Sequence, residues 1–215
     1  MRSRPFLPLM LLLPAISSPA QVSISIGLPH MSIGINVPTV PELVQVPGSP
    51  AYYAPGLDTN FFFYDGMYWV FKDDYWYASS WYNGPWAPVH PEAVPLFILR
   101  IPVAYYRQPP AYFRGWQADG PPRWGDHWGS DWARRRPGWD QVGRRPMPPP
   151  APLPVYQKNF RGEQYPTPER QHAIHTQNYS YKPKEPVVRG NYAAQTQHSR
   201  SAPKEGRPEE APKHR

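Results

Sequence analysis

The most constraining feature of this sequence is an aromatic segment at residues 61–86, FFFYDGMYWVFKDDYWYASSWYNGPW. Within it, Asp65-Gly66 is a two-residue turn signal between runs of aromatic and β-branched residues, the strongest short-range indication of a β-hairpin. Lys72-Asp73-Asp74 marks a second turn, so the segment predicts an antiparallel β-meander. The predicted strands are 61–64, 67–71 and 75–79.

A type I′ turn at Asp65-Gly66 fixes the register of the hairpin, because a shift by one residue moves every side chain to the opposite face. Both faces of the hairpin are then apolar. The expected cross-strand pairs are Phe63 with Tyr68 and Phe61 with Val70 on one face, and Phe62 with Trp69 and Tyr64 with Met67 on the other.

Composition limits how much of the chain can fold in this way. The 215 residues include 33 prolines and 15 glycines, a proportion close to that of low-complexity chains. All nine tryptophans lie between Trp69 and Trp139, so the foldable material is concentrated in about 100 residues, enough for one small core. The sequence therefore predicts a mainly β fold, with an aromatic β-domain at 21–106, a connector at 107–142 and a disordered, basic, Pro-rich tail at 143–215.

The N-terminus has the pattern of a secretory signal peptide at 1–20. Arg2 and Arg4 give it a positive start, residues 6–16 form an apolar stretch too short to span a bilayer, and cleavage is expected after Ala20. An uncleaved anchor is the alternative. The chain has no cysteine, so it has no lipidated cysteine, disulfide or thiolate site, and no later segment is apolar enough to be transmembrane. We expect the mature protein in the periplasm or outside the cell.

Two further parts of the predicted β-domain flank the meander. Residues 22–26 and 31–37 alternate polar and apolar side chains, which is typical of half-buried strands. Residues 96–103, LFILRIPV, indicate a last buried strand, with a short helix as the alternative.

The connector contains tryptophans at helical spacing. Trp124, Trp128 and Trp132 are four residues apart and would share one face of a short helix that begins near Pro122 and stops at Pro137. Such a face either packs against the β-domain or binds a partner.

The tail has little means of forming a core. Residues 147–154, MPPPAPLP, predict a polyproline II spacer, and a Gln-, Lys-, Arg- and Pro-rich composition follows. A short helix is predicted at 168–178, where Thr167 caps and Pro168 begins it, but it is marginal without a packed face.

Charge divides along the chain in the same way. Residues 21–106 hold six acidic and two basic residues, a net charge of −4, whereas residues 107–215 hold 19 basic and ten acidic residues, a net charge of +9. A basic tail outside the cytoplasm meets anionic envelope polymers such as lipopolysaccharide, polysaccharide or phospholipid head groups. It could also fold back onto the acidic domain or remain a solvated tail.

Candidate catalytic and metal-binding residues are few. His172-x-x-His175 has ligand spacing, but no carboxylate pair nearby completes a site. Asp65, Asp73 and Asp74 could serve as paired carboxylates for glycoside hydrolysis, although turns favour Asp for local reasons. The sequence has no nucleophile elbow, HExxH motif or phosphate-binding glycine loop. These patterns argue against an enzyme, and they predict no cofactor and no metal ion.

Several blocks together carry a resemblance. With FFFYDGMYWVF, DDYWYASSWYNGPW, VPLFILRIPVAYYR, PPRWGDHWGSDW and APLPVYQ, the chain resembles a group of uncharacterised exported proteins of Gram-negative proteobacteria. The resemblance implies export and a bacterial source, and it implies no site residues.

Two hypotheses for function follow. The first is a non-enzymatic structural or interaction protein of the cell envelope, whose partners are anionic envelope polymers or an envelope protein. The second is a carbohydrate-binding module for peptidoglycan or exopolysaccharide, because exposed aromatic rings stack on sugars. Its expected platform is Trp76, Trp81, Tyr82 and Trp86, and the alternative is that these rings belong to the core. Nucleic-acid binding comes third and would be confined to extracellular DNA.

Overall fold

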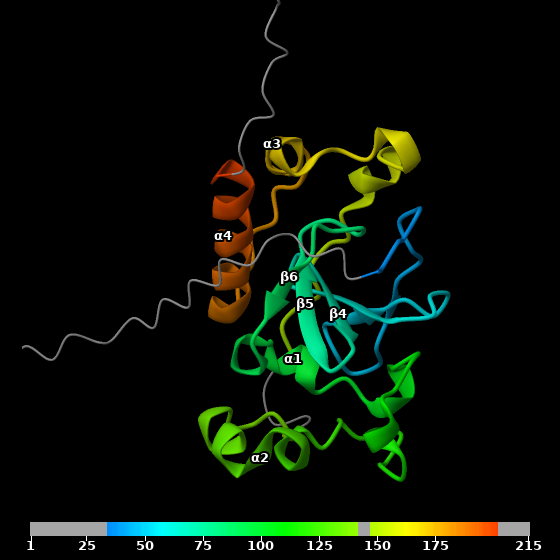
Figure 1. The fold of residues 1–215 in the computed structure, drawn as a ribbon, viewed down its shortest axis with the longest axis vertical. Helices are drawn as coiled ribbons and strands as arrows, with labels where there is room; N and C mark the ends of the chain where they lie inside the picture. Colours follow the sequence, from blue (N-terminus) through cyan, green and yellow to red (C-terminus); the bar gives the residue numbers. More distant parts are fainter. Residues whose placement is uncertain (1–33, 142–146, 202–215) are drawn as a thin grey trace, which may run out of the picture.

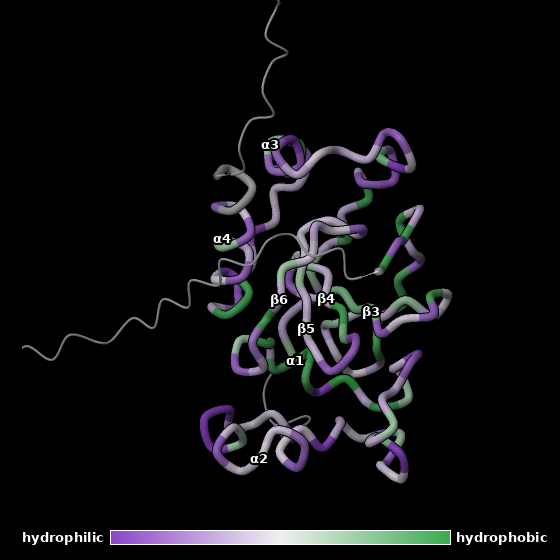
Figure 2. Tube along the Cα trace, viewed as in Figure 1, coloured by the Kyte–Doolittle hydropathy of each residue, from purple (hydrophilic) through white to green (hydrophobic). Residues whose placement is uncertain are grey.

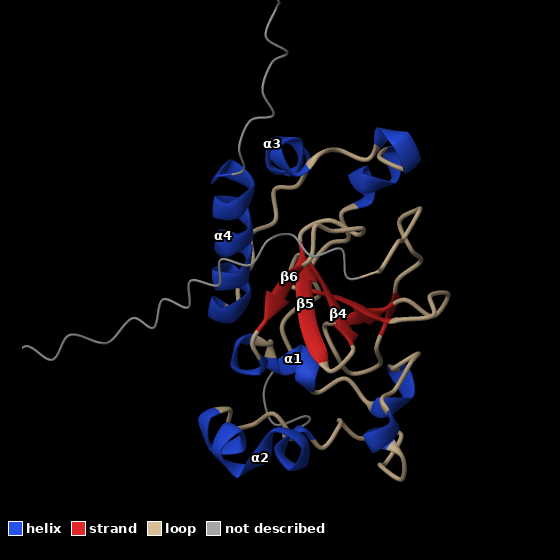
Figure 3. Ribbon diagram, viewed as in Figure 1, coloured by secondary structure: helices blue, strands red, loops and turns tan. Residues whose placement is uncertain are grey.

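The computed structural model describes residues 34–141 and 147–201 (Figure 1). Its centre is a six-stranded antiparallel sheet whose strands are neighbours in sequence order, and helices surround the sheet (Figure 3). The strands are β1 (Val44–Gln45), β2 (Tyr52–Tyr53), β3 (Asn60–Tyr64), β4 (Met67–Lys72), β5 (Tyr75–Ser79) and β6 (Ala87–Val89). The α-helices are α1 (Leu96–Leu99), α2 (Trp124–Arg135), α3 (Pro168–Asn178) and α4 (Pro186–Ser201). The 3-10 helices are η1 (Pro91–Ala93), η2 (Val103–Tyr105), η3 (Ala111–Phe113), η4 (Val155–Asn159) and η5 (Gly162–Gln164).

The predicted hairpin and its register are confirmed. β3 and β4 pair as Phe61 with Val70 and Phe63 with Tyr68, and the two predicted pairs on the other face are also present. Asp65 and Gly66 both have positive φ, 50° and 85°, as a type I′ turn requires. The turn between β4 and β5 uses two consecutive aspartates with positive φ, Asp73 at 49° and Asp74 at 68°. Local sequence therefore sets the centre of the sheet.

Both faces of the sheet are buried. One face carries Phe62, Trp69 and Trp76 and packs against α1, α2 and Val188 of α4. The other face carries Phe61, Phe63 and Tyr68 and packs against residues 35–43 and the C-terminal region around Ala151 and Tyr165. Figure 2 shows the apolar residues along β3 and α1, whereas α3 is mostly polar. A sheet with two apolar faces needs two covering layers, and chain segments on both sides of the meander supply them.

The tryptophan helix forms as predicted and packs against the sheet. Trp124 and Trp132 are buried, and the ring of Trp124 stacks on Trp128 with centroids 4.5 Å apart. The helix is kinked at Gly129, whose φ of 86° only glycine adopts readily. The stripe therefore belongs to the core of the protein.

The expected strand at 96–103 is wrong, and the alternative of a short helix is confirmed. Residues 96–99 form α1 and 103–105 form η2, because Pro95 and Pro102 each lead directly into a helical turn. The strand expected at 31–37 is also absent from 34–37, while its remaining residues and the strand at 22–26 lie outside the described residues. The proposed signal peptide at 1–20 lies outside them too.

The prediction of a disordered tail is wrong for residues 147–201. This region, the C-terminal strap, runs over the second face of the sheet and ends in α3 and α4 (Figure 1). Its composition is polar, but Ala151, Gln157 and Val188 are buried, so tertiary contacts replace the missing apolar pattern. The other tail residues, 143–146 and 202–215, lie outside the described residues.

The predicted antiparallel sheet is present, but the fold as a whole is not mainly β. Helical residues make up 35% of the structure and strand residues 14%, so the protein is a six-stranded antiparallel sheet wrapped by helices and turns. Within residues 34–141 and 147–201, no helix combines the length and the apolar character needed to cross a bilayer.

Candidate functional site

The predicted aromatic platform does not lie on the surface. Trp76, Trp81, Tyr82 and Trp86 are all buried, with exposed fractions of 1%, 0%, 1% and 3%. Trp76 packs on Phe71 and Trp124, whereas Trp86 packs on Phe61 across the opposite face. Rings enclosed in this way cannot stack on a sugar, so the observation that motivated a carbohydrate-binding module is removed.

The loop after β5 instead serves as the anchor for the strap. Gln157 of η4 is fully buried, and its side-chain carbonyl accepts hydrogen bonds from the Tyr68 hydroxyl at 3.2 Å and the Tyr82 backbone N–H at 3.3 Å. Its amide donates to the Ser80 carbonyl at 2.9 Å and to the Tyr156 hydroxyl at 3.1 Å. One side chain therefore satisfies polar groups of the sheet, the loop and the strap.

Two more glutamines hold the same loop. The Gln195 side chain, from α4, accepts from the Ser80 backbone N–H at 2.8 Å and donates to the Pro85 carbonyl at 2.9 Å. The Gln171 side chain, from α3, donates to the Gly84 carbonyl at 3.0 Å. Because each segment of the strap supplies one glutamine, the YASSWYNGPW block is a structural anchor.

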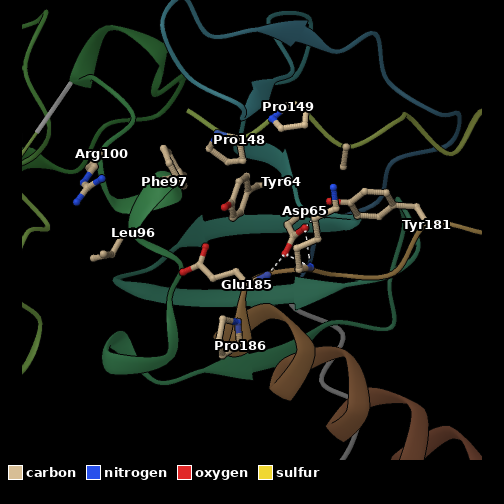
Figure 4. A pocket seen from close by; sticks show the side chains of 12 residues that line it. Tyr64, Asp65, Leu96, Phe97, Arg100, Pro148, Pro149, Tyr181, Glu185 and Pro186 are labelled. Atoms are coloured by element: carbon tan, nitrogen blue, oxygen red, sulfur yellow. Dashed lines mark hydrogen bonds between the residues drawn. The ribbon is translucent and has the colours of Figure 1, made fainter. Parts of the chain in front are cut away.

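A cavity of about 430 Å³ opens where the β3–β4 turn, α1, the proline segment and the start of α4 meet (Figure 4). Its walls include Tyr64, Phe97, Pro148 and Pro149, and Figure 4 shows the Glu185 side chain beneath them. A volume above about 300 Å³ with apolar walls and few polar groups is typical of small-ligand pockets. This cavity is therefore a candidate site of the described residues.

Asp65 fixes one side of the cavity. Its carboxylate accepts hydrogen bonds from the Tyr181 hydroxyl at 2.6 Å and from the backbone N–H groups of Lys184, at 3.0 and 2.9 Å, and Glu185, at 2.8 Å. The residue is only 4% exposed. Asp65 therefore fastens the strap to the hairpin turn, and it positions Glu185 at the cavity.

The ionisation of Glu185 and Tyr64 is set mainly by burial. Burial raises the pKa of the Glu185 carboxyl, while the Tyr64 hydroxyl, the Leu96 backbone N–H and the charge of Arg136 act in the opposite direction. Burial also raises the pKa of Tyr64 well above its usual range, and the charge of Glu185 adds to the shift. Tyr64 is therefore a neutral hydroxyl group beside a carboxyl group.

The three aspartates considered for hydrolysis are not brought together. Asp65 lies at the β3–β4 turn, whereas Asp73 and Asp74 lie at the other end of β4, about 20 Å away along a strand of this length. Asp74 accepts hydrogen bonds from the Tyr112 hydroxyl at 2.6 Å and from His127 at 3.0 Å, which ties the turn to η3 and α2. This separation excludes a catalytic pair between Asp65 and either of the other two aspartates, and the Asp74 carboxylate is already engaged by Tyr112 and His127.

The histidine pair is not placed as metal ligands. His175 is 4% exposed, and its Nδ1 lies 2.7 Å from the Tyr156 hydroxyl. Burial lowers the pKa of His175 to about 4, and the charge of His172 adds to this effect. In the part of the chain that the structure describes, no group of three or more His, Cys, Asp and Glu side chains could hold a metal ion.

We expect His175 to make the fold sensitive to acid. A histidine with a pKa of about 4 when folded and about 6.5 when unfolded takes up its proton earlier in the unfolded chain, so stability falls as the pH drops from 6.5 to 4. The full cost is about 3 kcal/mol, the equivalent of that difference. Urea unfolding at several pH values, compared with His175→Gln, measures it.

The difference between the two proteins isolates His175 from other titrations. Glu185 changes stability in the opposite direction, because its raised pKa makes its protonated form the more stable one as pH falls, and it is present in both proteins. Equal pH slopes in the wild type and His175→Gln would contradict the assignment.

The strap also carries a basic surface. Its exposed basic side chains outnumber its exposed acidic ones, Glu163 and Glu169. We call the exposed basic residues of the strap the strap cations: Lys158, Arg161, Arg170, Lys182, Lys184 and Arg189. The positive charge expected for a mobile tail is thus partly borne by a folded surface.

Comparison with known proteins gives no information on function. No protein-family model matches the chain, and neither a curated protein nor a solved structure matches it. The cavity and the strap cations are therefore judged by their chemistry alone.

Sequence reasoning missed the residues that build this site. Glu185 and Tyr181 lie in a segment predicted to be disordered, and Gln157 belongs to the APLPVYQ block without any pattern that marks it as buried. The one local signal was Asp65, which was correctly predicted to lie in a turn. Its carboxylate also binds the strap, and the turn pattern did not predict this contact. No spacing in the sequence links it to residues 181–185.

Proposed function

We propose that this chain is a non-enzymatic interaction protein of the bacterial cell envelope that binds anionic envelope polymers through the strap cations. The observation that carries the proposal is the excess of exposed Lys and Arg side chains over acidic ones on a folded strap. The pattern of Arg2, Arg4 and the apolar stretch at 6–16 supports export, which would bring this surface to the envelope.

Folding of the strap changes how the surface would bind. Cations on α3, η4 and the start of α4 have fixed positions, so they lose less conformational entropy on binding than cations on a mobile tail. The attraction is electrostatic and is weakened by salt, since the Debye length falls from about 30 Å at 0.01 M to about 3 Å at 1 M ionic strength. A folded scaffold with a basic face fits a protein that adheres to phosphate-bearing or carboxylate-bearing polymers.

Binding to anionic vesicles tests the proposal. The purified protein is expected to sediment with phosphatidylglycerol vesicles at about 20 mM NaCl and to be released at about 500 mM NaCl, because salt screens surface charges. Lys158→Glu/Arg161→Glu should weaken sedimentation at least about tenfold, whereas Arg107→Glu/Arg114→Glu, exposed cations outside the strap, should weaken it much less.

Both double variants change the net charge equally, so the comparison separates a particular surface from overall charge. An equal loss in the two would show that binding follows net charge, and no sedimentation of the wild type at low salt would end the proposal. Matching circular dichroism spectra establish that the variants are folded.

A further inference from the structure

The cavity in Figure 4 is built by segments that meet only in the folded protein. Tyr64 and Asp65 come from the β3–β4 hairpin, Phe97 from α1, Pro148 from the start of the strap, and Glu185 from the residue directly before α4. Its volume is about 430 Å³, and it is partly open to solvent.

The two carboxylates at this cavity have different surroundings. Asp65 is saturated, because the Tyr181 hydroxyl and two backbone N–H groups donate to it. Among the described residues, no Lys, Arg or His side chain forms an ion pair with Glu185 within 4.0 Å. The Tyr64 hydroxyl and the Leu96 backbone N–H donate to this carboxylate, and the charge of Arg136 acts on it from beyond ion-pair distance. A cation that entered the cavity would supply the close ion-pair partner that Glu185 lacks among the described residues.

Two aromatic rings that line the cavity already have cations of the protein beside them. The Arg100 guanidinium lies 5.7 Å from the centre of the Phe97 ring, and the Lys184 ammonium lies 5.7 Å from the centre of the Tyr181 ring. In Figure 4, the Arg100 side chain points away from the space between Tyr64 and Glu185. The Glu185 carboxylate borders this space (Figure 4).

From the cavity, its apolar walls and the Glu185 carboxylate without an ion pair within 4.0 Å among the described residues, we infer that this site binds a primary ammonium group carried on an apolar stem. The ammonium would pair with Glu185 and donate hydrogen bonds to its oxygens. The stem would lie along Phe97, Pro148 and Pro149 and bury apolar surface there. Either a free alkylamine or a lysine side chain of another protein has this chemistry.

Hexylammonium and its neutral counterpart hexanol test the inference by isothermal titration calorimetry and by chemical-shift changes in the amide NMR spectrum. Hexylammonium is expected to bind at least about tenfold more tightly than hexanol, and to shift amide signals of the 64–66 turn and residues 184–186. Lowering the pH should weaken binding, because protonation of Glu185 removes the partner charge. Equal affinities for the amine and the alcohol would overturn the inference.

Glu185→Gln keeps the shape of the side chain and removes its charge, so it should lower hexylammonium affinity at least about tenfold. Glu163→Gln, an exposed position on η5, should leave affinity unchanged. Undiminished binding in Glu185→Gln, with thermal unfolding showing that it is folded, would place the amine elsewhere. If this variant does not fold, the pH series and the hexanol comparison on the wild type still decide.

A lysine-containing tripeptide with blocked ends separates the two sources of the ammonium group. Binding of hexylammonium alone indicates a small free amine, and binding of both indicates that the site also accepts a lysine side chain. If neither binds, the inference is wrong. None of these results depends on anionic polymers, so they leave the proposed envelope function to its own test.

Discussion

A chain that stops before Met147 is expected to lose its cooperative unfolding transition. The truncation removes Ala151 and Gln157 from one face of the sheet and Val188 from the other, and it exposes the aromatic rings that they cover. It also strips partners from buried polar groups, among them the carbonyls of Ser80 and Gly84. The summed loss exceeds the whole stability of a typical domain, about 5–15 kcal/mol.

Near-ultraviolet circular dichroism and urea titration measure the effect of this truncation. The shortened chain should give no sigmoidal transition and should aggregate, since it exposes a two-faced aromatic sheet. A control chain that ends at Ser201 keeps every described contact of the strap and should unfold cooperatively. If the chain that ends at residue 146 unfolded with the midpoint of the full protein, the strap would be dispensable, as the composition of the tail had predicted.

The largest effect of a single substitution is expected at Gln157. Leucine at this position fills a similar volume but leaves the Tyr68 hydroxyl, the Tyr82 N–H and the Ser80 carbonyl without their buried partner. Each unsatisfied buried group costs about 1–3 kcal/mol, so Gln157→Leu should destabilise the protein by about 4 kcal/mol. Chemical denaturation, with the same slope for both proteins, gives the difference directly.

A second substitution checks the origin of that loss. Tyr68→Phe removes one of the stranded groups, so the double variant Gln157→Leu/Tyr68→Phe should lose about 1 kcal/mol less than the two single effects added together. Gln164→Leu, an exposed position on η5, should change stability by less than about 0.5 kcal/mol. A cost below about 1 kcal/mol for Gln157→Leu would show that water replaces its hydrogen bonds.

The covering layers of the sheet explain why a polar, proline-rich region folds at all. An isolated segment with the composition of 147–201 lacks the apolar surface to order itself. Here Tyr165 and three glutamines of the strap form hydrogen bonds to groups whose positions the sheet already fixes. Only the strap loses conformational entropy when these hydrogen bonds form. The composition of a segment indicates how much apolar surface the segment can bury by itself. It does not indicate which contacts other segments of the chain provide.

The sequence alone determined the features whose causes are local. Asp65-Gly66 and the flanking aromatic residues define a turn and a register, and the four-residue spacing of Trp124, Trp128 and Trp132 defines a helix face. Backbone conformation and side-chain alternation depend on only a few consecutive residues, so the local sequence is enough to predict them.

Only the tertiary structure decided which surfaces are buried and where the cavity lies. The sequence favoured a place in the core for Trp76 and Trp86 but left a sugar platform open, and the strap and α2 enclose the sheet and bury both rings. Asp65 and Glu185 are 120 positions apart in sequence, and a hydrogen bond joins the first carboxylate to the backbone N–H of the second residue. Such long-range pairing depends on how the whole chain closes its core, and no local pattern encodes it.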